Sequence, residues 1–209
     1  MDISLLQPGS LHTITGGMKG RKTPLFIYIF DQLKYTNIKT QIIKPACDYR
    51  DELHDKFDLP ENCVVSRTGL YLPATIVDDK DINDFLNKID YNADVIGLEE
   101  ITLFQYGDDL VNVIRDLMGK GKSAVCSGLD KNFRGEPFHP MPELMAYSTT
   151  VEKHYGVCDI ESCNRLGEYP QRIIDGQPAP YDSPIILVGA SEAYEIRCLK
   201  HHEVPGKPE

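Results

Sequence analysis

One glycine-rich stretch near the amino terminus narrows the possible folds of this chain more than any other feature. It reads Gly16-Gly-Met-Lys-Gly-Arg-Lys-Thr23. It lies between a short apolar run, residues 11–15, and a helical pattern that begins at residue 24. A strand, a glycine-rich turn and a helix in this order place backbone N–H groups at the positive end of a helix dipole, where anions bind. The stretch therefore predicts a phosphate-binding loop, and an ordinary glycine-rich turn is the alternative.

The loop follows the pattern G-x-x-x-x-G-K-[ST] with one departure. Lys22 can reach the β- and γ-phosphates of a nucleotide, and the Thr23 hydroxyl can hold Mg²⁺. Arg21 takes the place of the second glycine, and Gly20 comes one residue early. We expect the Arg21 side chain to point outward; the alternative is that it occupies the cradle. The candidate nucleotide-binding residues here are Gly16, Gly17, Met18, Lys19, Gly20, Arg21, Lys22 and Thr23.

Composition limits the classes of partner. A net charge of −10 argues against nucleic-acid binding, which needs a basic face. No apolar run approaches the about 18 residues that span a membrane, and the amino terminus lacks the pattern of a signal peptide. We therefore expect a cytoplasmic protein without a nucleic-acid or membrane partner. In that setting the six cysteines indicate thiols or metal ligands rather than disulfides.

Short apolar runs alternate with stretches of helical spacing along the first two thirds of the chain. The runs predicted as strands are 11–15, 40–44, 76–77, 95–98 and 123–127. The predicted helices are 23–35, 81–89 and 107–120. This alternation predicts an α/β fold of the P-loop (RecA-like) type, a parallel sheet with crossover helices.

The pattern changes after residue 140. We expect a helix at 142–154, a loop rich in glycine, proline and tyrosine at 167–184, and a strand at 185–188. This predicts a nucleotide-binding domain at residues 1–140 and a small second subdomain at residues 141–209.

A second nucleotide-site element is the run Val95-Ile-Gly-Leu-Glu99-Glu100. An apolar strand that ends in two carboxylates has the form of a Walker B element. Glu99 can bind Mg²⁺ directly or through water, and Glu100 can accept a proton from an attacking hydroxyl. Two exposed acids at a strand end are the alternative. In a parallel sheet this element and the phosphate loop emerge at the same carboxyl edge, where ligands bind.

Two pairs of ligand-type residues lie in the last third of the chain, Cys158-x4-Cys163 and Cys198-x2-His201. Thiolates and an imidazole in two close pairs can close a tetrahedral Zn²⁺ site, and four protein ligands make it structural. His202 competes with His201 as the fourth ligand, and buried thiols without metal are the alternative. The remaining cysteines lie in or beside apolar runs and suit packing: Cys47, Cys63 and Cys126.

Three further segments carry a family resemblance. They are Lys44-Pro-Ala-Cys-Asp-Tyr-Arg50, Gly128-Leu-Asp-Lys-Asn-Phe-Arg-Gly-Glu-Pro-Phe138 and the region 185–207, which contains the sequence Glu192-Ala-Tyr-Glu-Ile-Arg-Cys-Leu-Lys-His201. With the two nucleotide-site elements, they make the chain resemble the thymidine kinases of the zinc-lasso class (type II, cellular and bacterial). The resemblance covers essentially the whole chain.

The resemblance implies transfer of the ATP γ-phosphoryl group to the 5′-hydroxyl of thymidine, with Mg²⁺ and a structural Zn²⁺, in the salvage of DNA precursors. It makes Glu100 the general base, with Arg50 and Lys22 as further catalytic residues. It makes residues 1–140 the kinase domain and 141–209 a zinc-binding lasso. It also implies a homotetramer inhibited by dTTP. The implied substrate-binding residues are Met18, Leu129, Phe133, Phe138, Gly189 and Tyr194.

Four residues depart from the family pattern in or next to the nucleotide site. They are Arg21, Glu99 in place of aspartate, Thr102 in place of glutamine and Leu103 in place of phenylalanine. These departures keep two alternatives open. One is a regulatory nucleotide-binding protein on a kinase scaffold, with weak or no catalysis. The other is a kinase for a different deoxynucleoside.

Overall fold

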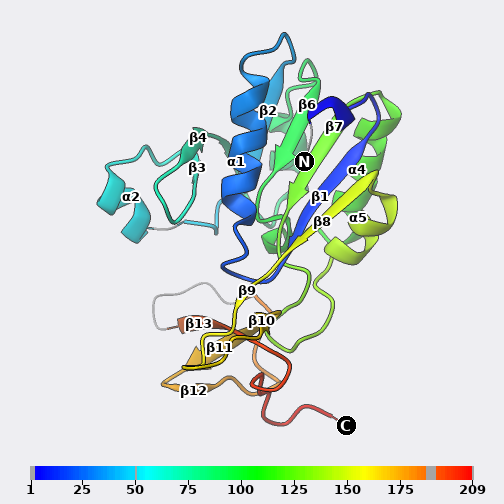
Figure 1. Cartoon of the computed structure of the whole chain (residues 1–209). Helices are drawn as coiled ribbons and strands as arrows, with labels where there is room; N and C mark the ends of the chain where they lie inside the picture. Colours follow the sequence, from blue (N-terminus) through cyan, green and yellow to red (C-terminus); the bar gives the residue numbers. More distant parts are fainter. Residues whose placement is uncertain (1–2, 50, 187–191, 209) are drawn as a thin grey trace.

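The computed structural model describes residues 3–49, 51–186 and 192–208. Its centre is a six-stranded sheet with the order β5-β2-β6-β7-β1-β8, in which every pair of neighbouring strands is parallel (Figure 1). Each of the five runs predicted as strands in the first two thirds of the chain is a strand of this sheet, so the predicted fold class is confirmed. The strands are β1 (Leu11–Gly16), β2 (Thr40–Pro45), β5 (Thr75–Val77), β6 (Val95–Leu98), β7 (Ser123–Ser127) and β8 (Thr150–His154).

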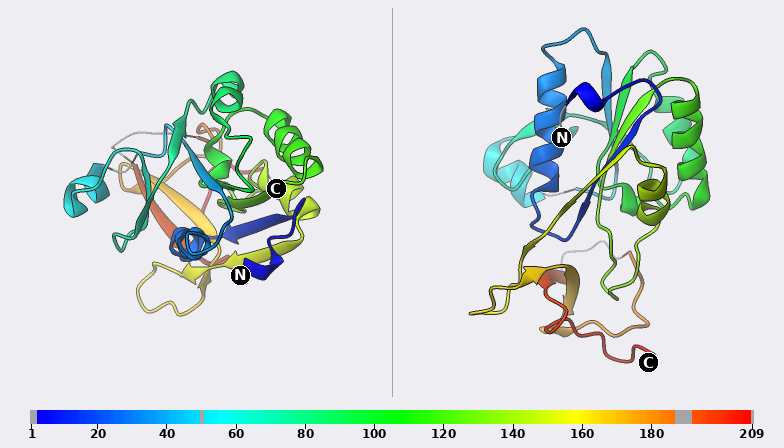
Figure 2. Two further views of the ribbon diagram at one scale, coloured as in Figure 1. Left: turned by 90° about the horizontal axis from the view of Figure 1, so that it is seen from above. Right: turned by 45° about the vertical axis from the view of Figure 1, so that its right-hand side comes forward.

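Helices cover both faces of the sheet (Figure 2). Helix α1 (Lys22–Leu33) packs through Phe26 and Phe30 on one face, together with Val95 and Val125 of the strands. The other face carries α3 (Ile82–Lys88), α4 (Asp108–Gly119) and α5 (Met141–Tyr147). Successive strand residues point to opposite faces. The two middle strands therefore contribute to both layers: Val95 and Val125 belong to the cluster on the α1 side, and Ile96, Leu98, Ala124 and Cys126 belong to the cluster on the other side.

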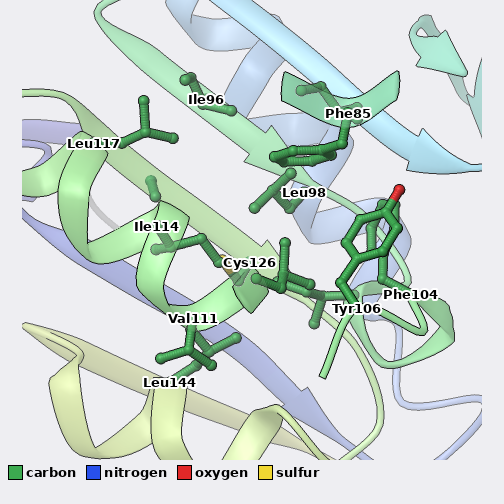
Figure 3. Packing of buried hydrophobic residues seen from close by; sticks show 14 of the residues in the cluster. Phe85, Ile96, Leu98, Phe104, Tyr106, Val111, Ile114, Leu117, Cys126 and Leu144 are labelled. Atoms are coloured by element: carbon green, nitrogen blue, oxygen red, sulfur yellow. The ribbon is translucent and has the colours of Figure 1, made fainter. Parts of the chain in front are cut away.

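The larger core cluster lies between the sheet and α3, α4 and α5 (Figure 3). At one end of it, the rings of Phe85, Phe104 and Tyr106 lie 5.3 to 5.9 Å apart between centroids. Each fully buried side chain of this size contributes roughly 1.5–3 kcal/mol to folding. On the opposite face, a Cβ at Gly97 would lie 2.4 Å from Cζ of Phe30, so this glycine permits the close approach of α1.

The remaining elements of the large domain are short. Among the described residues they are η1 (Ile3–Leu5), α2 (Asp51–Phe57), the hairpin strands β3 (Cys63–Val65) and β4 (Tyr71–Pro73), and η2 (Ile101–Leu103). No helix in the described ranges combines the length and the apolar content that crossing a membrane requires.

The helix predicted at 142–154 is wrong in its second half. Helix α5 ends at Tyr147, and Thr150–His154 is the edge strand β8, which pairs with β1. The residues of β8 explain the difference. Thr150 and Val151 are β-branched, and burial alternates along β8 with a period of two. Ser148 closes the helix, because its hydroxyl donates to the carbonyl of Leu144 at 2.7 Å.

Two small antiparallel sheets lie beyond the carboxyl edge of the large sheet (Figure 1). They contain β9 (Gly156–Val157) with β10 (Leu166–Gly167), and β11 (Tyr169–Ile174) with β12 (Gln177–Pro178) and β13 (Glu192–Arg197). The division at residue 140 stays a prediction, but the pairing of β8 favours a boundary near residue 155. Residues 185 and 186 form a bend instead of the predicted strand, and 187–188 lie outside the described residues.

Candidate active site

The loop between β1 and α1 is closed tightly against the end of β8. Gly16 has a φ of 116°, and a Cβ on it would lie 2.1 Å from the carbonyl oxygen of His154. A Cβ on Gly20 would lie 2.4 Å from the same atom. Neither position has room for a side chain. Lys22 is buried, and its ammonium group donates to the carbonyl oxygen of Gly17 at 2.7 Å. The loop therefore curves around the Lys22 ammonium group at the start of α1, which is the form that a phosphate cradle needs.

Arg21 stands directly before α1 with a φ of 62°, in the left-handed region that glycine adopts most easily. A non-glycine residue there costs on the order of 1 kcal/mol. The side chain is exposed, which agrees with the expectation that it points outward. Lys19 is the second left-handed residue of the loop, with a φ of 57°, and it is exposed as well.

A hydrogen bond joins the two predicted nucleotide-site elements. The Thr23 hydroxyl donates to Oε1 of Glu99 at 2.6 Å, and Glu99 is only 1 % exposed. Glu100 is the next residue. It is half-buried, has a φ of 49° and directly precedes η2. The carboxyl ends of β1 and β6 thus bring a hydroxyl and a carboxylate together beside a cradle of backbone N–H groups. Oxygen ligands of this kind suit Mg²⁺, so the residues present fit a bound magnesium nucleotide.

The loop after β2 lies at the same edge of the sheet. Lys44 is 2 % exposed, and its Nζ lies 3.3 Å from a carboxylate oxygen of Asp48. The backbone N–H of Cys47 donates to Asp79 at 3.1 Å. Burial, with the neighbouring Asp79, raises the pKa of the Cys47 thiol to about 12, so this cysteine is an inert packing group. Arg50, the predicted catalytic arginine, lies outside the described residues.

Three of the predicted nucleoside residues, Leu129, Phe133 and Phe138, lie in the loop after β7, whereas Met18 lies in the phosphate loop. Phe133 and Phe138 are buried, and Leu129 and Met18 are half-buried. A cavity of about 450 Å³ is lined by one of these residues, Phe138. Its wall includes Thr102, Asn132, Phe138, Ile185 and Ile186. Gly189, another predicted substrate residue, lies outside the described residues.

Arg172 organises this region, a role that the sequence pattern does not predict. It is 1 % exposed, and its Nε donates to the Tyr194 hydroxyl at 2.6 Å. Its guanidinium group also donates to the carbonyl oxygens of Pro184 and Ile185 and lies over the ring of Phe133. A buried arginine that binds several backbone carbonyls fixes the chain around it. Arginine is mostly exposed in proteins, so its identity alone gave no signal of this burial.

The four predicted metal ligands lie together: Cys158, Cys163, Cys198 and His201. Their ligand atoms all lie within 4.8 Å of one another. His201 Nδ1 lies 3.5 Å from the sulfur atoms of Cys158 and Cys198, and the Cys163 and Cys198 sulfur atoms are 3.9 Å apart. Tetrahedral zinc requires separations of about 3.5–3.8 Å between such ligand atoms. The donor set and its spacing are therefore compatible with a structural zinc.

His202, the competing fourth ligand, has a different position. Its Nε2 lies 2.9 Å from the Phe133 carbonyl oxygen, and its ring stacks on Tyr169 at 5.0 Å between centroids. Within the cluster, burial disfavours the Cys158 thiolate. Hydrogen bonds from the Ile160 backbone and from His201 outweigh burial and lower the pKa of that thiol. A lowered thiol pKa favours the form that binds metal. The pKa of the Cys163 thiol is raised instead: a hydrogen bond from the Arg165 backbone lowers it, but burial and the contacts with Cys158 and Cys198 outweigh that bond.

These features define a P-loop α/β protein whose site is arranged for phosphoryl transfer. Comparison with known proteins narrows the class. The family model for thymidine kinase matches residues 9–202. The chain is also 39% identical over 203 residues to the thymidine kinase of Coprothermobacter proteolyticus, covering 97% of this chain and 95% of that protein. The chain belongs to the thymidine kinase family.

Proposed function

We propose that this protein transfers the γ-phosphoryl group of ATP to the 5′-hydroxyl of thymidine, giving dTMP and ADP. One observation carries the proposal: the Thr23–Glu99 hydrogen bond, which joins the two nucleotide-site elements in a chain of this family. A kinase uses both parts of the molecule. The phosphate loop at the carboxyl edge of the large sheet would bind ATP, and the small subdomain would cover the nucleoside.

On the ATP side, the backbone N–H groups of the glycine-rich loop would bind the phosphates, and Lys22 would neutralise them. Thr23 and Glu99 would hold Mg²⁺, which supplies charge neutralisation at the β- and γ-phosphate oxygens. The longer side chain of Glu99, where the family usually has aspartate, still reaches the Thr23 hydroxyl. Arg50 would add a second positive charge next to the moving phosphoryl group.

On the thymidine side, Glu100 would accept the proton of the 5′-hydroxyl as that oxygen attacks phosphorus. Phe133 and Phe138 would enclose the base with Leu129 and Met18, and Tyr194 would border it from the small subdomain. Arg172 would fix Tyr194 and the adjoining backbone before substrate arrives. Water is a competing acceptor in this reaction, so a rigid cover over the nucleoside favours transfer to the sugar.

We further propose one structural Zn²⁺ per chain, held by Cys158, Cys163, Cys198 and His201. It would tie the turn between β9 and β10 to the segment after β13. Binding at four protein ligands adds directly to folding free energy. A homotetramer, feedback inhibition by dTTP and a cytoplasmic location stay predictions.

The test is an assay of the purified protein with Mg·ATP and, in parallel, thymidine, deoxycytidine, deoxyadenosine and deoxyguanosine. We expect dTMP and ADP in equal amounts with thymidine, and little transfer to the other nucleosides. Lys22→Met serves as the control for contaminating kinases and should abolish the activity. No transfer to any nucleoside would refute the proposal. A marked preference for a nucleoside other than thymidine would refute the assigned substrate.

A further inference from the structure

The small subdomain lies directly against the outer side of the phosphate loop (Figure 1). A Cβ on Gly17 would lie 2.6 Å from the carbonyl oxygen of Gly167 in β10, and 3.0 Å from the side chain of Ile196 in β13. A Cβ on Gly156, in β9, would lie 3.1 Å from the carbonyl oxygen of Met18. Three strands of the small subdomain therefore form a wall behind residues 17 and 18 of the loop.

One ion pair fastens the loop to this wall. The Lys19 ammonium group lies 2.6 Å from a carboxylate oxygen of Asp159, the residue that follows Cys158. The same oxygen accepts the backbone N–H of Ile196 at 2.8 Å, and the Asp159 N–H donates to the Ile196 carbonyl oxygen at 2.8 Å. Asp159 is thus held on β13 through its backbone and its side chain. A charge partner fixed in this way orients a lysine more strongly than a mobile surface acid does.

The backbone of the loop also depends on contacts from outside the loop. Lys19 is also one of the two left-handed non-glycine residues of the loop, a conformation that persists only where surrounding contacts hold it. The ion pair supplies such a contact from outside the loop.

We propose that Asp159 is a positioning residue for the ATP phosphate site, which acts by holding Lys19 and with it the phosphate loop in the shape that binds ATP. The proposal rests on the proposed function only in that the bound nucleotide is ATP. A loop that is already ordered loses less conformational entropy when phosphate binds. Loss of the ion pair should therefore weaken ATP binding. If Lys19 instead served the phosphates directly, removing Asp159 would release a cation and tighten ATP binding.

The experiment measures the dissociation constant of ATP by calorimetry, without thymidine, on the zinc-loaded full chain. The variants are Asp159→Asn, Lys19→Gln and the double variant. In Asp159→Asn, the amide side chain would keep an oxygen for the Ile196 N–H and lose only the charge. The matched control is Asp31→Asn, which removes an ion pair with Lys34 at 3.0 Å on the exposed face of α1. Zinc content is measured for each protein, because Asp159 follows a predicted zinc ligand.

We expect Asp159→Asn and Lys19→Gln each to weaken ATP binding about three- to tenfold. The double variant should resemble the singles, because both changes remove one interaction. The KM for thymidine and kcat should change less than twofold in Asp159→Asn, and the control should match the wild type. A merely destabilising change would not separate ATP from thymidine in this way.

Unchanged or tighter ATP binding in Asp159→Asn would overturn the proposal, and so would fully additive effects in the double variant. If Asp159→Asn loses zinc or fails to fold, Asp159→Ser replaces it, because serine also offers an oxygen to the Ile196 N–H without a charge for Lys19. Lys19→Gln alone does not separate the two roles of Lys19, since both predict weaker ATP binding, but unchanged ATP binding in that variant would also overturn the proposal. A wild-type protein that binds ATP but transfers nothing to thymidine would refute the proposed function. The dissociation constants of the wild type and the variants would still test the role of Asp159.

Discussion

The guanidinium carbon of Arg172 lies 4.2 Å from the centre of the Phe133 ring. Arg172 belongs to β11 of the small subdomain, and Phe133 belongs to the loop that follows β7 of the large sheet. The contact therefore spans the two parts of the molecule beside the predicted thymidine site. The same guanidinium group holds the Tyr194 hydroxyl, so one side chain sets the position of two aromatic residues.

We predict that Arg172→Met raises the KM for thymidine by about tenfold or more. Methionine has similar length but leaves the Tyr194 hydroxyl and two backbone carbonyls without their donor. The KM for ATP should change much less, since the phosphate loop lies elsewhere. Steady-state kinetics measure both constants. The control is Arg115→Met. The guanidinium carbon of Arg115 lies 4.5 Å from the centre of the Tyr147 ring, and both residues are exposed. Equal losses in both variants would contradict the role given to Arg172.

Arg21→Gly should change the KM for ATP by less than about tenfold, or roughly 1.4 kcal/mol. We expect the exposed arginine to leave the cradle open, so that its removal restores no blocked site. Relief of the left-handed conformation should leave the free energy of unfolding unchanged or raise it by up to about 1 kcal/mol. Asp58→Gly, at another exposed left-handed position with a φ of 52°, is the matched control. Strong kinase activity that appears only in Arg21→Gly would show that the arginine blocks the site.

Elemental analysis should find about one zinc per wild-type chain and close to none in Cys198→Ser. The variant should also unfold at a lower temperature, because the metal adds binding free energy to the folded state alone. Cys47→Ser is the control, since Cys47 lies outside the four-residue cluster. It should keep its zinc. Stoichiometric zinc that persists in Cys198→Ser would refute the ligand set.

His12 should make stability depend on pH. Its ring nitrogens lie 2.6 Å from the Thr150 hydroxyl and 3.0 Å from the Ser10 hydroxyl. Burial lowers the pKa of His12 from its ordinary value of 6.5, against smaller raising effects of the Leu5 backbone and Glu152. The unfolded chain binds this proton first as pH falls. His12 therefore lowers the free energy of unfolding as pH drops from 6.5 through the folded pKa.

Urea unfolding at about pH 7.5 and about pH 5.5 measures the contribution of His12 to the free energy of unfolding. The His12→Asn variant should lose less stability between the two values than the wild type does, whatever its absolute stability. Equal losses would show that His12 does not contribute to the pH dependence.

The sheet was predictable because its central strands are buried on both faces. Val95–Leu98 and Ser123–Ser127 are therefore continuous apolar or small-residue runs, and their predicted ends match the structure. The edge strand Thr150–His154 has mixed polar residues and follows a helix after only two residues. Its extended conformation depends on pairing with β1, which is distant in sequence, so a short window of sequence favours continuing the helix.

The site was predictable where its chemistry depends on local spacing. The phosphate loop, the Glu99–Glu100 pair and the two cysteine segments each form a recognisable short pattern. Contacts between distant residues have no such signal. Lys19 and Asp159 are 140 positions apart, and Arg172 and Tyr194 belong to different strands. Only the folded chain brings each pair together, and neither residue type is unusual at its place in the sequence.

The central claim is that the carboxyl edge of the sheet is a kinase site in which Glu100 removes the proton of the 5′-hydroxyl. The most direct measurement is kcat for thymidine phosphorylation by the wild type and by Glu100→Gln, with Glu143→Gln on the exposed side of α5 as control. Glutamine keeps the size of the side chain but cannot accept the proton. We predict a loss of on the order of 10²-fold or more in kcat, with nearly unchanged thymidine binding and a control equal to the wild type. A near-normal kcat in Glu100→Gln would contradict the account.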